Sequence, residues 1–145
     1  MSANEIHASQ GKERSSVTER KILVVDDEVD IASLISKAFE RYGLYFDMFS
    51  DPNRALQAFA KAPHGYALIV VDVRMPGMNG VELAMRIRQI CPDIQVLFMT
   101  AYLAEEMHTV PEGSIYKKDI IEKPFSLELF CKEIRKRLAL SSGLT

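Results

Sequence analysis

Carboxylates that directly follow short apolar segments are the residues of this chain best suited to chemistry. An Asp-Asp-Glu run, 26–28, comes after the apolar segment 21–25, and Asp72 ends a second apolar segment and precedes the proline- and glycine-rich loop 75–80. A buried strand that ends on a carboxylate and breaks into such a loop is typical of a βα junction, so we expect Asp72 at a sheet edge where ligands bind. A purely structural role for Asp72, as an acceptor for loop amides, is the alternative at this point.

Two more polar side chains follow apolar segments, Thr100 after 94–99 and Lys123 after 115–122. Taken singly, each has an ordinary explanation, since Thr100 could cap a helix and Lys123 could be a solvated charge; Asp27 could likewise be a cap. In a parallel sheet, however, the carboxyl ends of all strands lie at one edge. We therefore expect a cluster there of Asp26, Asp27, Asp72, Thr100 and Lys123.

The chemistry of such a cluster follows from its charges. Carboxylates a few ångströms apart repel by roughly 4 kcal/mol per close pair at an effective dielectric constant near 20, so a cation must compensate them. Oxygen ligands without His or Cys favour Mg²⁺, which often completes its shell with phosphate oxygens. Lys123 and Thr100 would supply a positive charge and a hydroxyl to a phosphoryl group, and Asp72 could be the nucleophile that forms an aspartyl-phosphate.

Continuous apolar runs alternate with segments of helical periodicity along the chain. This alternation predicts an α/β fold, a doubly wound five-stranded parallel sheet with helices on both faces. Asp47 interrupts the second strand, which we expect at an edge with one face in water. The predicted strands are 21–25, 44–50, the segment ending at Asp72, 94–99 and 115–122, and the predicted helices are 29–42, 52–62, 80–90, 127–140 and a short one that begins near Ala101 and ends at 110–113.

Composition restricts the class of protein. The 145 residues, 48% hydrophobic and 26% charged, suit one domain, 21–140, between a disordered tail 1–20 and a short tail 141–145. A net charge of −2 gives no basic surface for nucleic acid, and we assign the basic run 132–137 to a solvated helix face. The chain has two cysteines and neither a leader nor an apolar stretch of about 18 residues, which predicts a cytoplasmic protein outside the membrane.

Over about residues 20–140, the pattern resembles the receiver domain of two-component response regulators. The resemblance rests on Asp26-Asp27, on Asp72 with Met75-Pro76-Gly77-Met78-Asn79-Gly80, on Thr100-Ala101 and on Lys123-Pro124-Phe125. It implies a flavodoxin-like sheet of strand order 2-1-3-4-5. It also implies that Asp72 accepts a phosphoryl group from a sensor histidine kinase or a histidine phosphotransfer protein.

The resemblance further implies roles for the other residues of the cluster. Asp27 would bind Mg²⁺, or Mn²⁺ in its place, directly, Asp26 mainly through water, and the backbone carbonyl of Arg74 would be another ligand. Lys123 would contact the phosphoryl group, Thr100 would move to hydrogen-bond it, and the peptide bond before Pro124 would be cis.

The chain departs from the family pattern at the residue three before Lys123. Receivers usually carry Tyr or Phe there as a switch, and this chain has Ile120. We hypothesise that Tyr102 replaces part of that switch or shields the phosphoryl group, the alternative being an ordinary surface tyrosine. The side chain of Arg74 could tune the access of water to the phosphoryl group.

Other function classes fit less well. A phosphatase of the haloacid-dehalogenase type needs a second Asp where Arg74 stands, so we expect no turnover enzyme, and the acidic run 26–28 would repel the phosphate of an FMN carrier. A receiver-like interaction module that signals without phosphorylation is the remaining alternative. We expect a stand-alone receiver, a monomer or weak dimer, that binds its downstream partner through the face formed by 101–110, 115–122 and 127–140.

Overall fold

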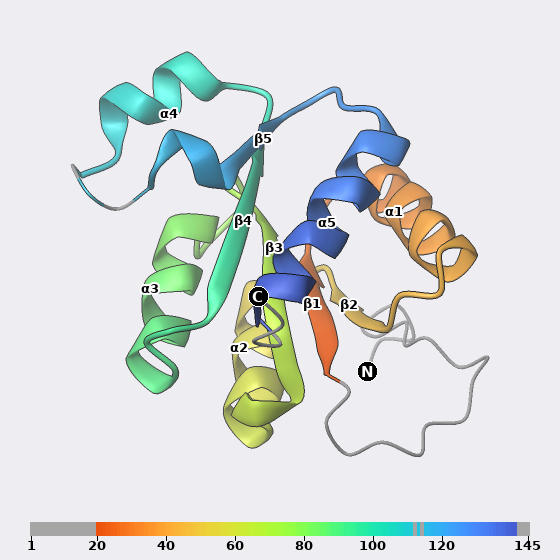
Figure 1. Ribbon diagram of the computed structural model, residues 1–145. Helices are drawn as coiled ribbons and strands as arrows, with labels where there is room; N and C mark the ends of the chain where they lie inside the picture. Colours follow the sequence, from red (N-terminus) through yellow and green to blue (C-terminus); the bar gives the residue numbers. More distant parts are fainter. Residues whose placement is uncertain (1–19, 112, 114, 142–145) are drawn as a thin grey trace.

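A five-stranded parallel sheet organises the protein, as a computed structural model shows (Figure 1). The structure describes residues 20–111, 113 and 115–141. The strand order is β2-β1-β3-β4-β5, which confirms the predicted fold class. The predicted tails lie outside the described residues, except for Arg20 and Ser141. The strands are β1 (Lys21–Val25), β2 (Phe46–Phe49), β3 (Tyr66–Asp72), β4 (Gln95–Thr100) and β5 (Ile120–Glu122).

Helices cover both faces of the sheet. In Figure 1, α1 and α5 lie on one side of the strands and α2 and α3 on the other. Alternate residues of each central strand enter two separate cores, so that Val70 packs with α1 and α5 whereas Val71 packs with α2 and α3. The helices are α1 (Val29–Arg41), α2 (Pro52–Lys61), α3 (Gly80–Ile90), α4 (Leu103–Thr109) and α5 (Leu127–Ser141), with short 3₁₀ turns η1 (Pro63–Gly65) and η2 (Lys117–Asp119).

The second strand is at the sheet edge as predicted, but the expectation that one of its faces is wet is wrong. All four residues of β2 are buried, and Asp47 is only 8% exposed. Its carboxylate accepts a 2.6 Å hydrogen bond from the Tyr66 hydroxyl and lies 3.1 Å from Lys21 Nζ. The carboxylate is therefore buried because a donor and a cation compensate its desolvation.

The C-terminal third differs from its predicted boundaries. Strand β5 contains only Ile120–Glu122, and the residues just before it form the 3₁₀ turn η2 instead of extended chain. Helix α4 begins at Leu103, two residues later than expected, and has about two turns as predicted. A buried arginine explains the turn.

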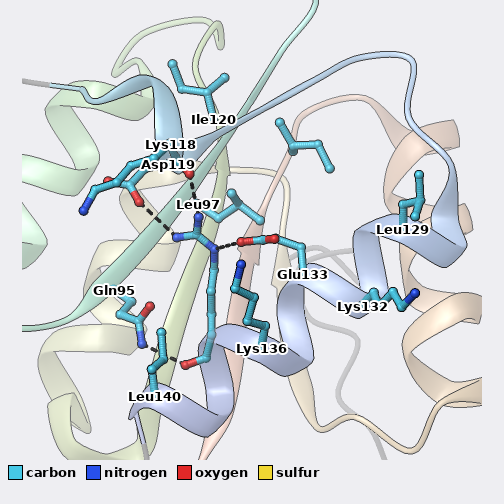
Figure 2. A pocket seen from close by; sticks show the side chains of 12 residues that line it. Gln95, Leu97, Lys118, Asp119, Ile120, Leu129, Lys132, Glu133, Lys136 and Leu140 are labelled. Atoms are coloured by element: carbon cyan, nitrogen blue, oxygen red, sulfur yellow. Dashed lines mark hydrogen bonds and ion pairs between the residues drawn. The ribbon is translucent and has the colours of Figure 1, made fainter.

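That arginine, Arg137, was expected on a solvated face but is 9% exposed. Its Nη1 donates to Asp119 at 3.0 Å, its Nη2 to the Lys118 carbonyl at 2.7 Å, and its Nε to Glu133 at 2.7 Å (Figure 2). These bonds fix η2 against α5, and the backbone of 117–119 consequently folds toward the helix.

The state of the cysteines and the length of the helices bear on two expectations from the sequence, the cytoplasmic location and the position outside the membrane. Both cysteines are free thiols, Cys131 being buried and Cys91 half-buried. Among the residues that the structure describes, no helix has the length and apolar character needed to cross a membrane.

Candidate functional site

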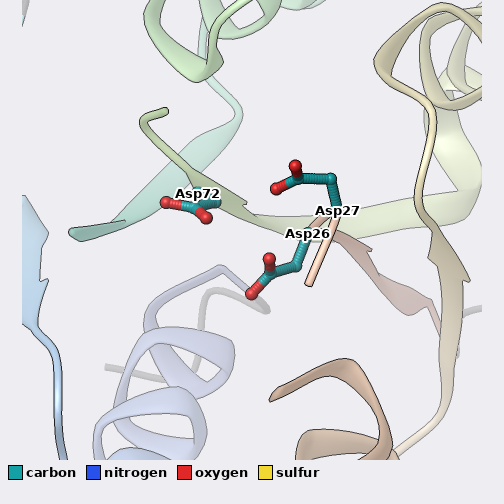
Figure 3. A group of neighbouring side chains, drawn as sticks. All are labelled: Asp26, Asp27 and Asp72. Atoms are coloured by element: carbon teal, nitrogen blue, oxygen red, sulfur yellow. The ribbon is translucent and has the colours of Figure 1, made fainter. Parts of the chain in front are cut away.

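The adjacent strands β1 and β3 bring three carboxylates together at their C-terminal ends (Figure 3). Carboxylate oxygens of Asp26, Asp27 and Asp72 all lie within 4.8 Å of one another. Asp26 and Asp72 are buried, and Asp27 is half-buried. The arrangement arises because the register places Val25 beside Val71, so that the next residues, Asp26 and Asp72, are neighbours.

Lys123, which follows the edge strand β5, adds a positive charge to this group of carboxylates. Its Nζ lies 3.2 Å from Asp72 Oδ2 and 3.4 Å from Asp26 Oδ2. The residue follows β5, its backbone N–H donates to the Thr100 carbonyl at 2.7 Å, and the Lys123–Pro124 peptide bond is cis. The lysine side chain is 10% exposed, so its charge acts on the carboxylates with little water between them.

A fourth carboxylate, Glu28, also holds the lysine. Its Oε1 lies 2.8 Å from Lys123 Nζ, and 58% of its side chain is exposed. Glu28 was noted as part of the acidic run but was not placed in the predicted cluster. Its position directly after two site aspartates was the available signal.

Burial changes the pKa values of the group. Burial raises the pKa of Asp26 from 3.8 to about 7, although the Glu28 N–H and the charge of Lys123 oppose the change. Burial also raises the pKa of Asp72, against the charge and hydrogen bond of Lys123. For Lys123, burial lowers the pKa, but the hydrogen bond with Glu28 and the two buried aspartates outweigh it and raise the pKa overall. The cluster therefore has excess negative charge that a bound cation or a proton would relieve.

Thr100 is buried at the end of β4, beside the strand that carries Asp72. Its hydroxyl oxygen accepts a 2.9 Å hydrogen bond from the backbone N–H of Tyr102, the N-cap residue of α4. The hydroxyl is thus engaged with the helix that follows it, and its own proton is available for an acceptor.

The loop after Asp72 requires a glycine at position 80, where the backbone lies close to the end of β3. Gly80 N donates to the Val73 carbonyl at 2.8 Å, and a Cβ added at Gly80 would lie 2.2 Å from the carbonyl oxygen of Asp72. Asn79 caps α3 through its side chain, which accepts from Glu82 N at 2.9 Å. The sequence pattern identified Gly80 only as part of a loop, whereas the fold needs it to bring α3 against the end of β3.

The residues suggested for tuning lie around the site without entering its carboxylate group. The Arg74 guanidinium stacks over the Tyr102 ring, with Cζ 4.1 Å from the ring centroid, and pairs with Glu105 and Glu106 of α4. Half of the Tyr102 side chain is exposed. Ile120 is half-buried and packs against the core that contains α2 and α3.

The donor set of the site fits a hard divalent cation. Three carboxylates converge, neither His nor Cys is among them, and the buried pair has raised pKa values that ion binding would lower again. One edge of the sheet thus holds a carboxylate that can act as a nucleophile, three carboxylates that can bind a cation, a lysine and a buried hydroxyl. Together these groups are equipped for phosphoryl transfer.

Comparison with known families agrees with this chemistry. The family model described as "Response regulator receiver domain" matches residues 22–135. The response regulator receiver protein CpdR of Brucella abortus is 30% identical over 119 residues, which cover 82% of this chain and 97% of CpdR. Sporulation initiation phosphotransferase F of Bacillus subtilis is also 30% identical, with 85% of this chain and 97% of that protein covered.

Longer proteins match over part of their length. The transcriptional regulatory protein CpxR homolog of Haemophilus influenzae is 33% identical, and the match covers 73% of this chain but 44% of that protein. Among solved structures, the receiver domain of NtrX from Brucella abortus has a TM-score of 0.70 at 27% identity, with 81% of this chain and 98% of that chain covered. The chemotaxis protein CheY4 of Vibrio cholerae has a TM-score of 0.71 at 25% identity, with the same coverage.

Proposed function

The chain belongs to the response regulator receiver domain family, and we propose that Asp72 accepts a phosphoryl group from a sensor histidine kinase or a histidine phosphotransfer protein. The observation that supports this proposal most directly is the position of the Asp72 carboxylate. It lies at the end of the central strand β3, 3.2 Å from Lys123 Nζ and within 4.8 Å of two further carboxylates. An aspartate with only a structural role would need no such surroundings.

In the proposed reaction a carboxylate oxygen of Asp72 attacks the phosphorus atom of the donor. An O–P bond forms, and the bond between phosphorus and the donor's leaving group, a histidine nitrogen, breaks. The electron pair of that bond leaves with the nitrogen, which then takes a proton. Because burial raises the pKa of Asp72, the positive charge of Lys123 is needed to keep the attacking oxygen ionised.

We propose that the three clustered carboxylates bind Mg²⁺, or Mn²⁺ in its place. Asp26, Asp27 and Asp72 would hold the ion with their carboxylates, and Arg74 would contribute its backbone carbonyl. When bound, the ion supplies positive charge to the oxygens of the phosphoryl group. Lys123 would contact that group from the β5 side, and Thr100 would donate its hydroxyl proton to it.

The phosphorylated domain would act by changing the binding of another protein or by passing the phosphoryl group on. We propose that it does so as a stand-alone receiver and as a monomer or weak dimer. Two relatives support the stand-alone role, since the match covers 97% of CpdR and 97% of sporulation initiation phosphotransferase F. We infer a signalling domain rather than a turnover enzyme. The free thiols of the two cysteines are consistent with the cytoplasm.

We propose the face of α4, β5 and α5 for the downstream partner. A groove of about 830 Å³ lies on the β5–α5 part of this face (Figure 2). The exposed Leu129 lines it together with Lys132 and Lys136. An apolar surface beside lysines suits a partner segment that carries both apolar and acidic residues.

A receiver-fold module that signals without phosphorylation is the second candidate. Ile120 favours it, because this half-buried residue packs against the core and has no aromatic ring that could change position with the state of Asp72. The complete carboxylate group and Lys123 favour the first candidate, since an unphosphorylated module gains nothing from three clustered carboxylates.

Incubation with a small phosphodonor distinguishes the two candidates. Wild type should gain the mass of one acid-labile phosphoryl group in Mg²⁺ and lose that gain in EDTA. Asp72→Asn should gain nothing. Asp93→Asn, which changes an exposed loop carboxylate, is the matched control and should behave as wild type. If wild type binds Mg²⁺ but takes up no phosphoryl group, the protein is the interaction module instead.

A further inference from the structure

Arg74 connects the loop after β3 to helix α4 by three contacts of one guanidinium. Its Nη2 donates to Glu105 Oε1 at 2.8 Å, its Nε donates to Glu106 Oε2, and its Cζ lies 4.1 Å from the centroid of the Tyr102 ring. A hydrogen-bonded pair on one edge and an aromatic ring against the face together fix a planar guanidinium in one orientation.

Glu106 makes this contact more than a surface ion pair. Only 7% of its side chain is exposed, compared with 64% for Glu105. A carboxylate that is shielded from water needs a charged partner, and Arg74 is the partner that the structure shows for it. The position of α4 therefore depends on the position of Arg74.

The same residue adjoins the proposed phosphoacceptor. Arg74 stands two positions after Asp72, and its backbone N–H lowers the pKa of the Asp72 carboxyl. On the other side of the site, the Thr100 hydroxyl accepts from the Tyr102 N–H at the start of α4. Helix α4 is thus joined to the end of β3 and to the end of β4, and each joint involves a group that a phosphoryl group on Asp72 would contact.

Other attachments of α4 are weak. It has only seven residues, and it is the one described element whose backbone does not pack closely against another element. A cleft of about 500 Å³ between α3 and α4, lined in part by Arg74, Glu106 and Val110, leaves room beside the pair. A short helix with few other contacts responds strongly to a change in one ion pair.

We propose that the Arg74–Glu106 ion pair, supported by the Tyr102 ring, couples the phosphorylation state of Asp72 to the position and stability of α4. The inference rests on the proposed function, since it needs a phosphoryl group on Asp72. Arg74 and Glu106 are positioning residues in this account. They act on the helix that the partner would contact and take no part in the transfer itself.

The direction of the change follows from the competition for hydrogen bonds and charge. Phosphorylation makes one Asp72 oxygen the bridging oxygen of an acyl phosphate and adds phosphoryl oxygens with more negative charge. Those oxygens attract the guanidinium of Arg74 away from the two glutamates, and they accept a hydrogen bond from the Thr100 hydroxyl, which draws that hydroxyl away from the Tyr102 N–H. Both changes loosen α4, so its backbone amides should exchange with solvent faster.

Hydrogen exchange of the full chain in Mg²⁺, with and without a small phosphodonor, tests the proposal. In wild type, phosphorylation should speed exchange in 103–109 about tenfold, because a hydrogen bond to a charged group is weakened. Glu106→Ala should exchange rapidly in α4 without phosphate and change less than about twofold on phosphorylation, since no intact pair remains to be opened. Glu106→Gln, which keeps a hydrogen-bond acceptor but no charge, should lie between the two.

Glu82→Ala is the matched control, because it removes an exposed glutamate that pairs with Arg86 at 3.0 Å on α3. It should respond as wild type. If phosphorylation still speeds amide exchange in α4 tenfold in Glu106→Ala, the inference is overturned, because a merely structural role of Glu106 changes the exchange rate equally in both phosphorylation states. If phosphorylation does not speed exchange in wild type, the inference is overturned as well. Wild type that takes up no phosphoryl group overturns the proposed function and the inference with it, and the mass spectrum separates this case from the others.

Discussion

Replacing Asp26 by asparagine should stabilise the metal-free protein at pH 8. The carboxyl group of Asp26 is fully buried, and burial raises its pKa from 3.8 to about 7. Asparagine has nearly the same shape, keeps an oxygen for the Glu28 N–H, and gains an amide donor close to the Asp72 carboxylate. The substitution therefore removes a buried charge without opening a cavity.

The size of the effect follows from the pKa change. A difference of about three units corresponds to about 4 kcal/mol between the two protonation states. Because the pKa in the folded state is the higher one, the stabilising contribution of the protonated group is complete below pH 3.8 and is lost as the pH rises to about 7. Asp26→Asn also removes the 3.4 Å contact with Lys123, so we expect a net gain of about 2–4 kcal/mol at pH 8.

Urea unfolding followed by far-ultraviolet circular dichroism, in EDTA between pH 5 and pH 8, measures this gain. The advantage of Asp26→Asn over wild type should be largest at pH 8 and should shrink as the pH falls through 7. Mg²⁺ should then stabilise wild type more than the variant. Asp93→Asn is the control and should show no such trend. An Asp26→Asn protein that is less stable than wild type at pH 8, or whose advantage is independent of pH, would refute the reasoning.

Three further substitutions test how the site and its supports are built. Gly80→Ala places a methyl group against the carbonyl of Asp72, so it should cost about 3 kcal/mol in urea unfolding and reduce phosphoryl uptake; unchanged values for both would contradict the close approach. Tyr66→Phe leaves buried Asp47 without its hydroxyl donor and should lower the free energy of unfolding by about 1–2 kcal/mol, which an unaltered urea midpoint would disprove. Arg137→Met leaves the partly exposed carboxylates of Asp119 and Glu133 without their cation, which should cost about 2 kcal/mol and speed amide exchange in η2, whereas slow exchange there would show that the turn forms without the arginine.

The sheet and its order could be predicted because short apolar runs and polar strand ends are local signals. The family was predicted from the residues at four strand ends, and the family model confirms it. The geometry that brings the three aspartates together also follows from the sheet, since β1 and β3 are neighbours in every sheet of this order. Their chemical roles remain predictions that the experiments above test.

The errors occurred where a charged residue is buried with partners distant in sequence. Asp47 looked like a wet edge residue, because its donors Tyr66 and Lys21 belong to other strands. Arg137 looked like part of a basic surface, and its partner Asp119 lies 18 positions away. Hydrophobic periodicity places charged residues on the solvent-exposed face of an element. It contains no information about ion pairs between residues that are distant in sequence.

The contact between Arg74 and α4 was missed for a related reason. The residue was noted only because it stands two positions after Asp72, and nothing in the sequence places Glu106 beside it. Helix α4 has only seven residues, so its sequence shows too few turns to predict which of its faces contacts the rest of the protein.

The identity of the phosphorylated residue is the most direct test of the central claim. Borohydride reduces an aspartyl-phosphate to homoserine, so the reduced protein can be digested and the modified residue located by peptide mass spectrometry. After incubation with a small phosphodonor and Mg²⁺, homoserine should appear at position 72 and nowhere else. Homoserine at Asp26 or Asp27 instead, or none at any position in a protein that binds Mg²⁺, would contradict the account.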